Sequence, residues 1–302
     1  MKRLVILTLV GACVLSGCRR SGDLPPAEVL RRATLKSSQL QSADVDASLD
    51  VSLQRGGSRL SGKAVLRGVL TDAGEQAAFS LQAQGILDRG EDRSAFRWSA
   101  EVVRDGEETY LLIREALVQP PSVEPQGLDA LLGAWWTLPH GGDRTVVRSL
   151  TPDPRFLRAQ SAVVTVFTDR GLEDIGGRNA YHYLVSIDPD RLVALMQGLA
   201  EERGQPFSAE EVRRALEAYD ARGELWIDAK TFVVHRISWT IVSNNTPPTM
   251  RLGLRMDLRK HDSAPAVTVP VESKPLDSAI FSAAILRQAQ DAVLPHNPWL
   301  NP

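Results

Sequence analysis

The sequence contains very little cysteine. Its 302 residues include two, Cys13 and Cys18, and the first lies in an apolar N-terminal stretch that we expect to be removed. A mature chain with one cysteine cannot form an internal disulfide, and it has no pair of thiols with which to bind a metal. The fold therefore depends on its apolar core, for which a chain of roughly 285 residues is long enough.

The sequence also lacks an excess of either charge. Lys and Arg number 35, Asp and Glu number 37, and the net charge is -2. Loss of Lys2 and Arg3 with the N-terminal stretch lowers it by two, to -4. No run of basic residues interleaved with aromatic ones occurs along the chain. Since nucleic-acid-binding domains carry such a basic surface, we exclude a nucleic acid as a partner.

The sequence motifs of common enzymes are absent as well. The chain has no GxSxG, no HExxH and no phosphate-binding loop. His182 lies between two tyrosines of an alternating segment, where a solvated or hydrogen-bonded strand histidine is the simplest interpretation. The five histidines are scattered along the chain: His140, His182, His235, His261 and His296.

Three carboxylates precede a Gly-Gly turn and resemble a small acidic site: Asp169, Glu173 and Asp174. Carboxylates in such a loop are more often simply solvated. We predict a protein that is not an enzyme, with no catalytic residue, no metal and no cofactor.

The N-terminus has the pattern of a secretion signal. Lys2 and Arg3 are followed by an apolar run, Leu4 to Leu15, and then by small residues that end at Cys18. The run is shorter than the ~20 residues that a membrane-spanning helix needs, so the pattern indicates a cleaved signal peptide. The stretch LSGC resembles a bacterial lipobox, and this resemblance implies that Cys18 is acylated and becomes the first mature residue.

These features predict an extracytoplasmic protein of the bacterial envelope, anchored to a membrane by its N-terminal acyl group. Residues 1-17 form the signal peptide and residues 18-26 a polar tether. The alternative is an ordinary signal peptide in which Cys18 occurs by chance.

Alternation of apolar and polar residues dominates the rest of the chain. In ADVDASLDVSL (Ala43–Leu53) every second residue is apolar, which is typical of a strand with one dry face. The pattern recurs in RLSGKAVLRGVL, EQAAFSLQAQG, SAFRWSAEV, NAYHYLVSID, FVVHRISWTIV and MRLGLRMDLRK. The first runs are joined by short turn-like segments, so they predict an antiparallel meander.

Helices are predicted at both ends of the domain and in its middle. A first helix at Ala27–Leu40 follows Pro25-Pro26, and Asp277 caps a closing helix. We predict an α+β fold, a curved antiparallel sheet with helices packed on its concave side. It forms one domain at 27-287, followed by a loose tail at 288-302.

The middle helices form an insert at about 189-221. Ser208 and Glu211 are spaced as a capping box, in which each side chain satisfies a free backbone N–H group. The apolar stripe of the second helix is predicted to consist of Val212, Ala215, Leu216 and Tyr219.

Several stretches together resemble one group of proteins. They are LRRATLKSSQLQSADVDASLDVSL, AWWTLP, IGGRNAYHYLVSID and GELWIDAKTFVVHRISWTI. In this order they are similar to segments of the LolA-like superfamily, and especially of the LppX/LprG-type envelope lipoproteins. The resemblance implies a half-open barrel with helices at its mouth, and a concave apolar face that binds the acyl chains of lipids or lipoproteins. The insert at 189-221 and the tail depart from the pattern of this group.

The dry faces of the strands are predicted to line a ligand cavity. One set of residues belongs to these faces: Val51, Leu53, Leu66, Phe79, Leu81, Trp98, Ile237 and Trp239. Small residues recur among the large ones and would leave space for a ligand: Ala47, Gly62, Ala64, Gly68, Ala77, Ala83, Gly85 and Ala100. The alternative is that these glycines mark bends in the strands.

Two functions remain open from the sequence. The first is a membrane-anchored lipoprotein that binds a lipid or acyl-bearing ligand and acts as a carrier. The second is a non-enzymatic interaction or sensor lipoprotein that binds another envelope protein.

Overall fold

A computed structural model describes residues 24-90, 92-120, 129-138, 161-202, 204-243 and 249-276. The signal peptide, Cys18, the closing helix after Asp277 and the tail lie outside the described residues. His140 and His296 lie outside them too. Among the described residues, no helix is long and apolar enough to cross a membrane.

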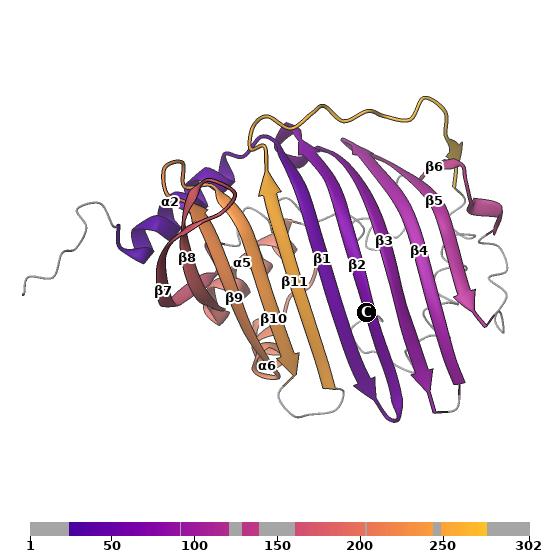
Figure 1. Cartoon of the computed structure of the whole chain (residues 1–302), viewed down its shortest axis with the longest axis horizontal. Coiled ribbons are helices and arrows are strands. Elements are labelled where there is room, and N and C mark those ends of the chain that lie inside the picture. The colour runs from indigo at the N-terminus through magenta and orange to yellow at the C-terminus, as the bar shows by residue number, and fades with distance from the viewer. Residues whose placement is uncertain are drawn as a thin grey trace, which may run out of the picture.

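Twelve strands form one sheet, in the order β12-β6-β5-β4-β3-β2-β1-β11-β10-β9-β8-β7 (Figure 1). Their bounds are β1 Ala43–Arg55, β2 Ser58–Thr71, β3 Gln76–Arg89, β4 Asp92–Asp105, β5 Glu108–Gln119, β6 Trp135–Thr137, β7 Val164–Asp174, β8 Asn179–Ile187, β9 Tyr219–Asp228, β10 Val234–Ser243, β11 Thr249–Arg259 and β12 Lys274–Pro275. The long strands pair antiparallel, as the alternation predicted, and β12 pairs with β6 in parallel.

The sheet consists of two meanders joined at the first strand. Strands β2 to β5 follow one another in space as in sequence, and so do β7 to β11. Strand β1 lies between β2 and β11, where Val45 pairs with Gly68 on one side and with Leu258 on the other. The N-terminal strand therefore lies near the middle of the sheet (Figure 1).

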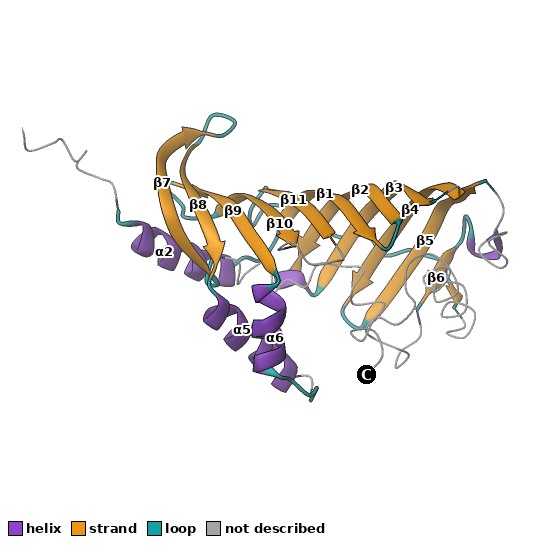
Figure 2. Cartoon of the chain, turned by 90° about the horizontal axis from the view of Figure 1, so that it is seen from below, coloured by secondary structure: helices purple, strands orange, loops and turns teal. Residues whose placement is uncertain are grey.

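Three α-helices in the described part of the chain lie on one side of the sheet, near β7 to β10 (Figure 2). They are α2 (Pro26–Ser38), α5 (Pro189–Glu202) and α6 (Ala209–Glu217). Helix α2 starts with a proline, which needs no N–H partner there, and it buries Val29, Leu30 and Ala33. This arrangement confirms the predicted α+β fold, a curved, open antiparallel sheet with helices on one face.

The second helix of the insert differs from the prediction. Ser208 does cap it, since its hydroxyl accepts a hydrogen bond from the Glu211 N–H at 3.3 Å. The helix ends at Glu217, however, and none of its residues is fully buried. Tyr219 begins β9, where it pairs with Ser243 of β10 and is exposed. Because ten residues from Tyr219 onward gain strand partners, the chain leaves the helix earlier than the apolar spacing suggested.

Two apolar clusters bury the same side of the sheet. The first joins α2 to strands β1 to β3 and β7 to β11, and it contains Val29, Ala47, Phe79, Leu225 and Ile237. The second lies over β4 and β5 and contains Ala100, Val102, Leu111, Leu131 and Leu276. The first cluster therefore covers this side of the sheet at β1 to β3 and β7 to β11, and the second covers it at β4 and β5.

Candidate functional site

One face of the sheet carries an apolar row that crosses nine strands. Directly paired residues of neighbouring strands point to the same face. The row runs through Tyr183, Leu225, Ile237, Met256, Ala47, Leu66, Leu81, Ala100 and Ile113. We call this side the apolar face. Every second residue along a strand belongs to the same face, and by this count all eight predicted ligand-binding residues lie on the apolar face.

Burial changes along the apolar face from one end to the other. On β1, Ala43, Val45 and Ala47 are buried, whereas Val51 and Leu53 further along the same strand are partly exposed. The buried end is the one that contacts α2. The other end we call the open end of the apolar face.

The eight predicted residues divide between these two ends. Phe79, Ile237 and Trp239 are buried in the first cluster, so their contacts are with the protein itself. Leu66 packs in part against that cluster, and Trp98 in part against the second. Three others are partly exposed: Val51, Leu53 and Leu81.

Two paired rows form the open end. The first consists of Ile241, Leu252, Val51, Gly62, Gly85, Phe96 and Val118, and the second of Met250, Leu53, Leu60 and Leu87. All of these side chains are apolar or absent, and all of these residues are partly exposed. Leu60, Leu87 and Phe96 were not among the predicted residues, although they obey the same alternation.

The small residues have a different role from the one that the sequence suggested. A Cβ atom at Gly85 would lie 2.6 Å from the ring of Phe96, and one at Gly68 would lie 2.7 Å from the ring of Phe79. At Gly223 it would lie 2.7 Å from the ring of Trp239. The interpretation of Gly68 and Gly85 as space for a ligand is therefore wrong. Each glycine leaves room for an aromatic ring of the neighbouring strand.

Comparison with known proteins finds similar solved structures. The chain is similar to lipoproteins of the LppX group. LprF from Mycobacterium bovis is 14% identical, covers 81% of this chain and 95% of its own, and has a TM-score of 0.38. The lipoprotein LppX from Mycobacterium tuberculosis is 12% identical, with coverage of 80% and 98% and a TM-score of 0.35.

A β-barrel-like protein from Brucella abortus, of a domain of unknown function, is 12% identical, with coverage of 72% and 98% and a TM-score of 0.30. No family model and no curated protein matches the chain. The solved structures thus include the group of lipoproteins that the sequence resembles. At these identities and TM-scores the likeness says nothing about a ligand or a role.

The polar face of the sheet carries the histidine that the sequence placed in a strand. His182 is hydrogen-bonded, as predicted: Nδ1 lies 2.8 Å from a Glu173 carboxylate oxygen and Nε2 lies 2.8 Å from one of Glu224. Its ring stacks on Trp226 at 4.3 Å between centroids, and the Trp226 indole donates to Glu173. Glu173 and Glu224 thus hold the ring of His182 in place on the polar face.

The carboxylates near His182 act within the protein structure. Asp169 accepts a hydrogen bond from the N–H of Gly171 at 2.8 Å, and Asp174 accepts one from Gly177 at 3.1 Å. Each thereby stabilises its own turn. No group of three His, Cys, Asp or Glu side chains that could hold a metal ion occurs in the described residues.

A second polar cluster is buried at the turn between β9 and β10. The His235 Nε2 lies 3.2 Å from an Asp228 oxygen, and the His235 ring meets His261 edge to face at 5.1 Å. Burial opposes ionisation of Asp228, but hydrogen bonds from the N–H groups of Thr231 and Lys230 outweigh it and lower its pKa to about 2. These bonds close the turn, which is a structural role.

Proposed function

We propose that the chain is a lipid-anchored lipoprotein of the bacterial envelope that binds a lipid or another acyl-bearing ligand at the open end of its apolar face. It performs no chemistry on this ligand. The observation that supports the proposal most directly is the pair of apolar rows that remain partly exposed on β1 to β5, β10 and β11.

Contiguous exposed apolar surface is uncommon on a soluble domain and often marks a binding site. Val51, Leu53, Leu60, Leu87 and Phe96 lie in adjacent rows of neighbouring strands. Covering such surface contributes ~25 cal/mol per Å², so a ligand that lies along the rows gains affinity in proportion to its apolar length.

The chemistry of the open end favours an acyl chain over a polar ligand. Its two rows contain no charged side chain, and the polar group that adjoins them is the hydroxyl of Ser94, which pairs with Leu87. Charged residues such as Lys63 and Arg97 are on the opposite face of the same strands, because they alternate with Gly62 and Phe96. A flexible hydrocarbon chain matches a site of this kind, whereas a sugar or nucleotide would lose its hydrogen bonds to water there.

The anchor of the proposed lipoprotein is Cys18. Each buried methylene contributes ~0.8 kcal/mol, so two or more acyl chains hold a protein on a membrane where one does not. Cys18→Ser should block processing at LSGC, and mass spectrometry of the purified chain would reveal the missing acyl mass. A Cys18→Ser variant that still carries the acylated mature mass would refute the anchor.

The binding site is tested by filling it. Leu87→Trp and Leu60→Trp place a large ring in the second row of the open end, and we expect binding of a fluorescent fatty acid to weaken at least ten-fold. The matched control is Gln82→Trp, which adds the same ring to the exposed opposite face of β3. Unfolding midpoints measured beside binding distinguish a cavity from a filled core, since overpacking a full core costs ~1-3 kcal/mol.

Two outcomes would contradict the proposal. The first is a wild-type protein that binds no fatty acid. The second is a pair of face variants that lose stability but bind as well as the control variant does. Either result would favour the alternative function, an interaction or sensor lipoprotein. In that protein the apolar face would form an ordinary hydrophobic core and would bind no ligand.

A further inference from the structure

A second apolar surface lies beside α2, away from the open end. A groove of about 830 Å³ separates the outer flank of α2 from the start of β7, and Arg191 at the start of α5 forms one of its edges. Leu30 and Leu35 line it from α2, and Val164 and Val166 line it from β7. We call this the α2 groove.

The groove contains an apolar residue that the fold leaves uncovered. Leu35 is 52% exposed, although Leu30, which also lines the groove, is buried. It lies one turn after Arg31 and next to Lys36, both of which are exposed. An exposed leucine between basic residues on a short helix is typical of a helix that lies in the interface of a membrane.

The charges around the groove favour an anionic surface. Two cations line the groove, Arg31 of α2 and Arg191 of α5, and they are ion-paired with Glu28 and Asp188. Helix α2 as a whole carries a net charge of +2, from three basic residues against Glu28. The side chains of Arg31 and Arg191 remain 66% and 59% exposed despite their ion pairs, so both can contact a phosphate.

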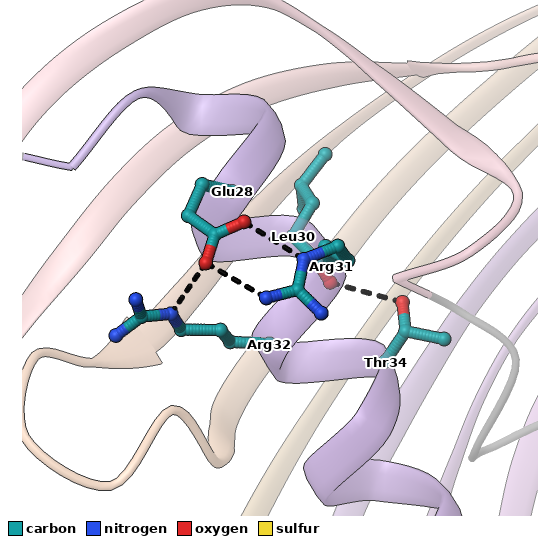
Figure 3. A network of polar contacts seen from close by, with 5 residues as sticks. All are labelled: Glu28, Leu30, Arg31, Arg32 and Thr34. Carbon is teal, nitrogen blue, oxygen red and sulfur yellow. Dashed lines mark hydrogen bonds and ion pairs between the residues drawn. The ribbon is translucent and has the colours of Figure 1, made fainter.

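Glu28 binds two of the basic side chains of α2. Its carboxylate accepts hydrogen bonds from Arg31 at 2.8 Å and from Arg32 at 2.7 Å (Figure 3). The bond from Arg31, followed by that from Arg32, lowers the pKa of Glu28 to about 2. The pair of guanidinium groups is thus held in place by one carboxylate that stays ionised at neutral pH.

The length of the tether places α2 near the bilayer. Pro26, the first residue of α2, follows Cys18 by eight residues. An extended chain covers at most ~3.6 Å per residue, so the start of α2 lies within about 29 Å of an acylated Cys18. Strands β4 to β6 lie at the opposite end of the sheet (Figure 1).

We propose that the α2 groove docks on the anionic bilayer to which the chain is tethered, with Leu35 in the headgroup region and Arg31 and Arg191 against lipid phosphates. Docking at this surface holds the domain in one orientation and leaves the open end of the apolar face directed away from α2. The inference rests on the proposed function only for the tether at Cys18.

The test uses the full processed chain in vesicles of phosphatidylcholine and phosphatidylglycerol. Leu35→Cys is labelled with an environment-sensitive fluorophore, and quenching by brominated lipid is measured. Cys18 does not interfere, because its thiol carries the anchor. The control is a label at Val242→Cys, another exposed apolar residue, on β10. We expect strong quenching at position 35 and little at position 242.

The charge of the surface is tested with two further variants. Replacing Arg31 and Arg191 together by Gln should reduce quenching of the position-35 label, by about five-fold in apparent lipid affinity for each charge removed. Glu28→Gln frees two guanidinium groups and should increase that affinity. Vesicles of phosphatidylcholine alone should abolish the difference among the variants.

The possible failures are distinguishable. Vesicle-bound protein with equal quenching at positions 35 and 242 would overturn the docking and leave the anchor intact. A chain that mass spectrometry finds without acyl groups would refute the anchor; quenching at position 35 in a Cys18→Ser background, where no second thiol is labelled, would then still support the docking. Protein that does not float with the vesicles at all would refute both.

Discussion

Replacement of Gly68 by alanine should destabilise the protein through the contact between β2 and β3. A Cβ atom at this position would overlap the carbonyl oxygen of Ala78 and would lie 2.8 Å from the Cα of Phe79. Both are backbone atoms, so no rotation of a side chain relieves the contact. The two strands must move apart at a place where they are hydrogen-bonded on both sides.

The size of the effect follows from two opposing contributions. Overpacking in a core costs ~1-3 kcal/mol or more, whereas alanine in a strand is favoured over glycine by roughly 0.5-1 kcal/mol. We expect Gly68→Ala to lower the free energy of unfolding by about 2 kcal/mol. Gly253→Ala on β11 is the matched control, because its Cβ would meet nothing nearer than the Asp50 Cβ at 3.8 Å.

Urea unfolding followed by tryptophan fluorescence measures both variants. Their slopes should agree, so that the difference in midpoint reports stability alone. We expect Gly253→Ala to be as stable as the wild type or slightly more stable. If Gly68→Ala unfolds within about 0.5 kcal/mol of the Gly253→Ala control, the close approach of the two strands, and the explanation of this glycine, would be refuted.

Three further predictions concern the polar groups. Folding lowers the pKa of Asp228 from 3.8 to about 2. The ionised carboxylate therefore stabilises the fold above pH 4, and this contribution is lost as pH falls toward 2. Asp228→Asn should remove this loss in acid and lower the free energy of unfolding by about 2 kcal/mol at neutral pH. Burial lowers the pKa of His261 from 6.5, so stability should also decline as pH falls below 6.5, and His261→Gln should flatten that slope in unfolding curves. Single replacement of His182, Glu173 or Asp169 by Ala should leave ligand binding within a few-fold of the wild type, and a loss of ~10³ in a folded variant would indicate missed chemistry.

The strands and the faces of the sheet were predictable because alternation is a local property. A strand with period two assigns each residue to one face without knowledge of its neighbours. The eight residues chosen from the sequence therefore share one face. Burial within that face depends on what lies above it. That Ala47 belongs to the buried cluster and Leu53 does not is not encoded in the alternation.

Contacts between distant segments were beyond the sequence pattern. The pairing of β1 with β11 follows from the order of strands, which alternation does not specify. His182 meets Glu224 because β8 and β9 are neighbours, and no local signal marks that pair. The packing of an aromatic ring against a glycine is also a contact between distant segments, since Phe96 and Gly85 lie on different strands.

The central place of β1 has a consequence for how the chain folds. Val45 pairs with Gly68 soon after both are made, but its other partner, Leu258, follows more than 200 residues later. Pairing over such sequence separations raises the contact order and slows folding. Until β11 pairs with β1, one edge of β1 has unpaired N–H and C=O groups that can bind another extended chain. Because synthesis proceeds from the N-terminus, this edge stays unpaired for most of it, so we expect the incomplete sheet to be the species most prone to aggregation.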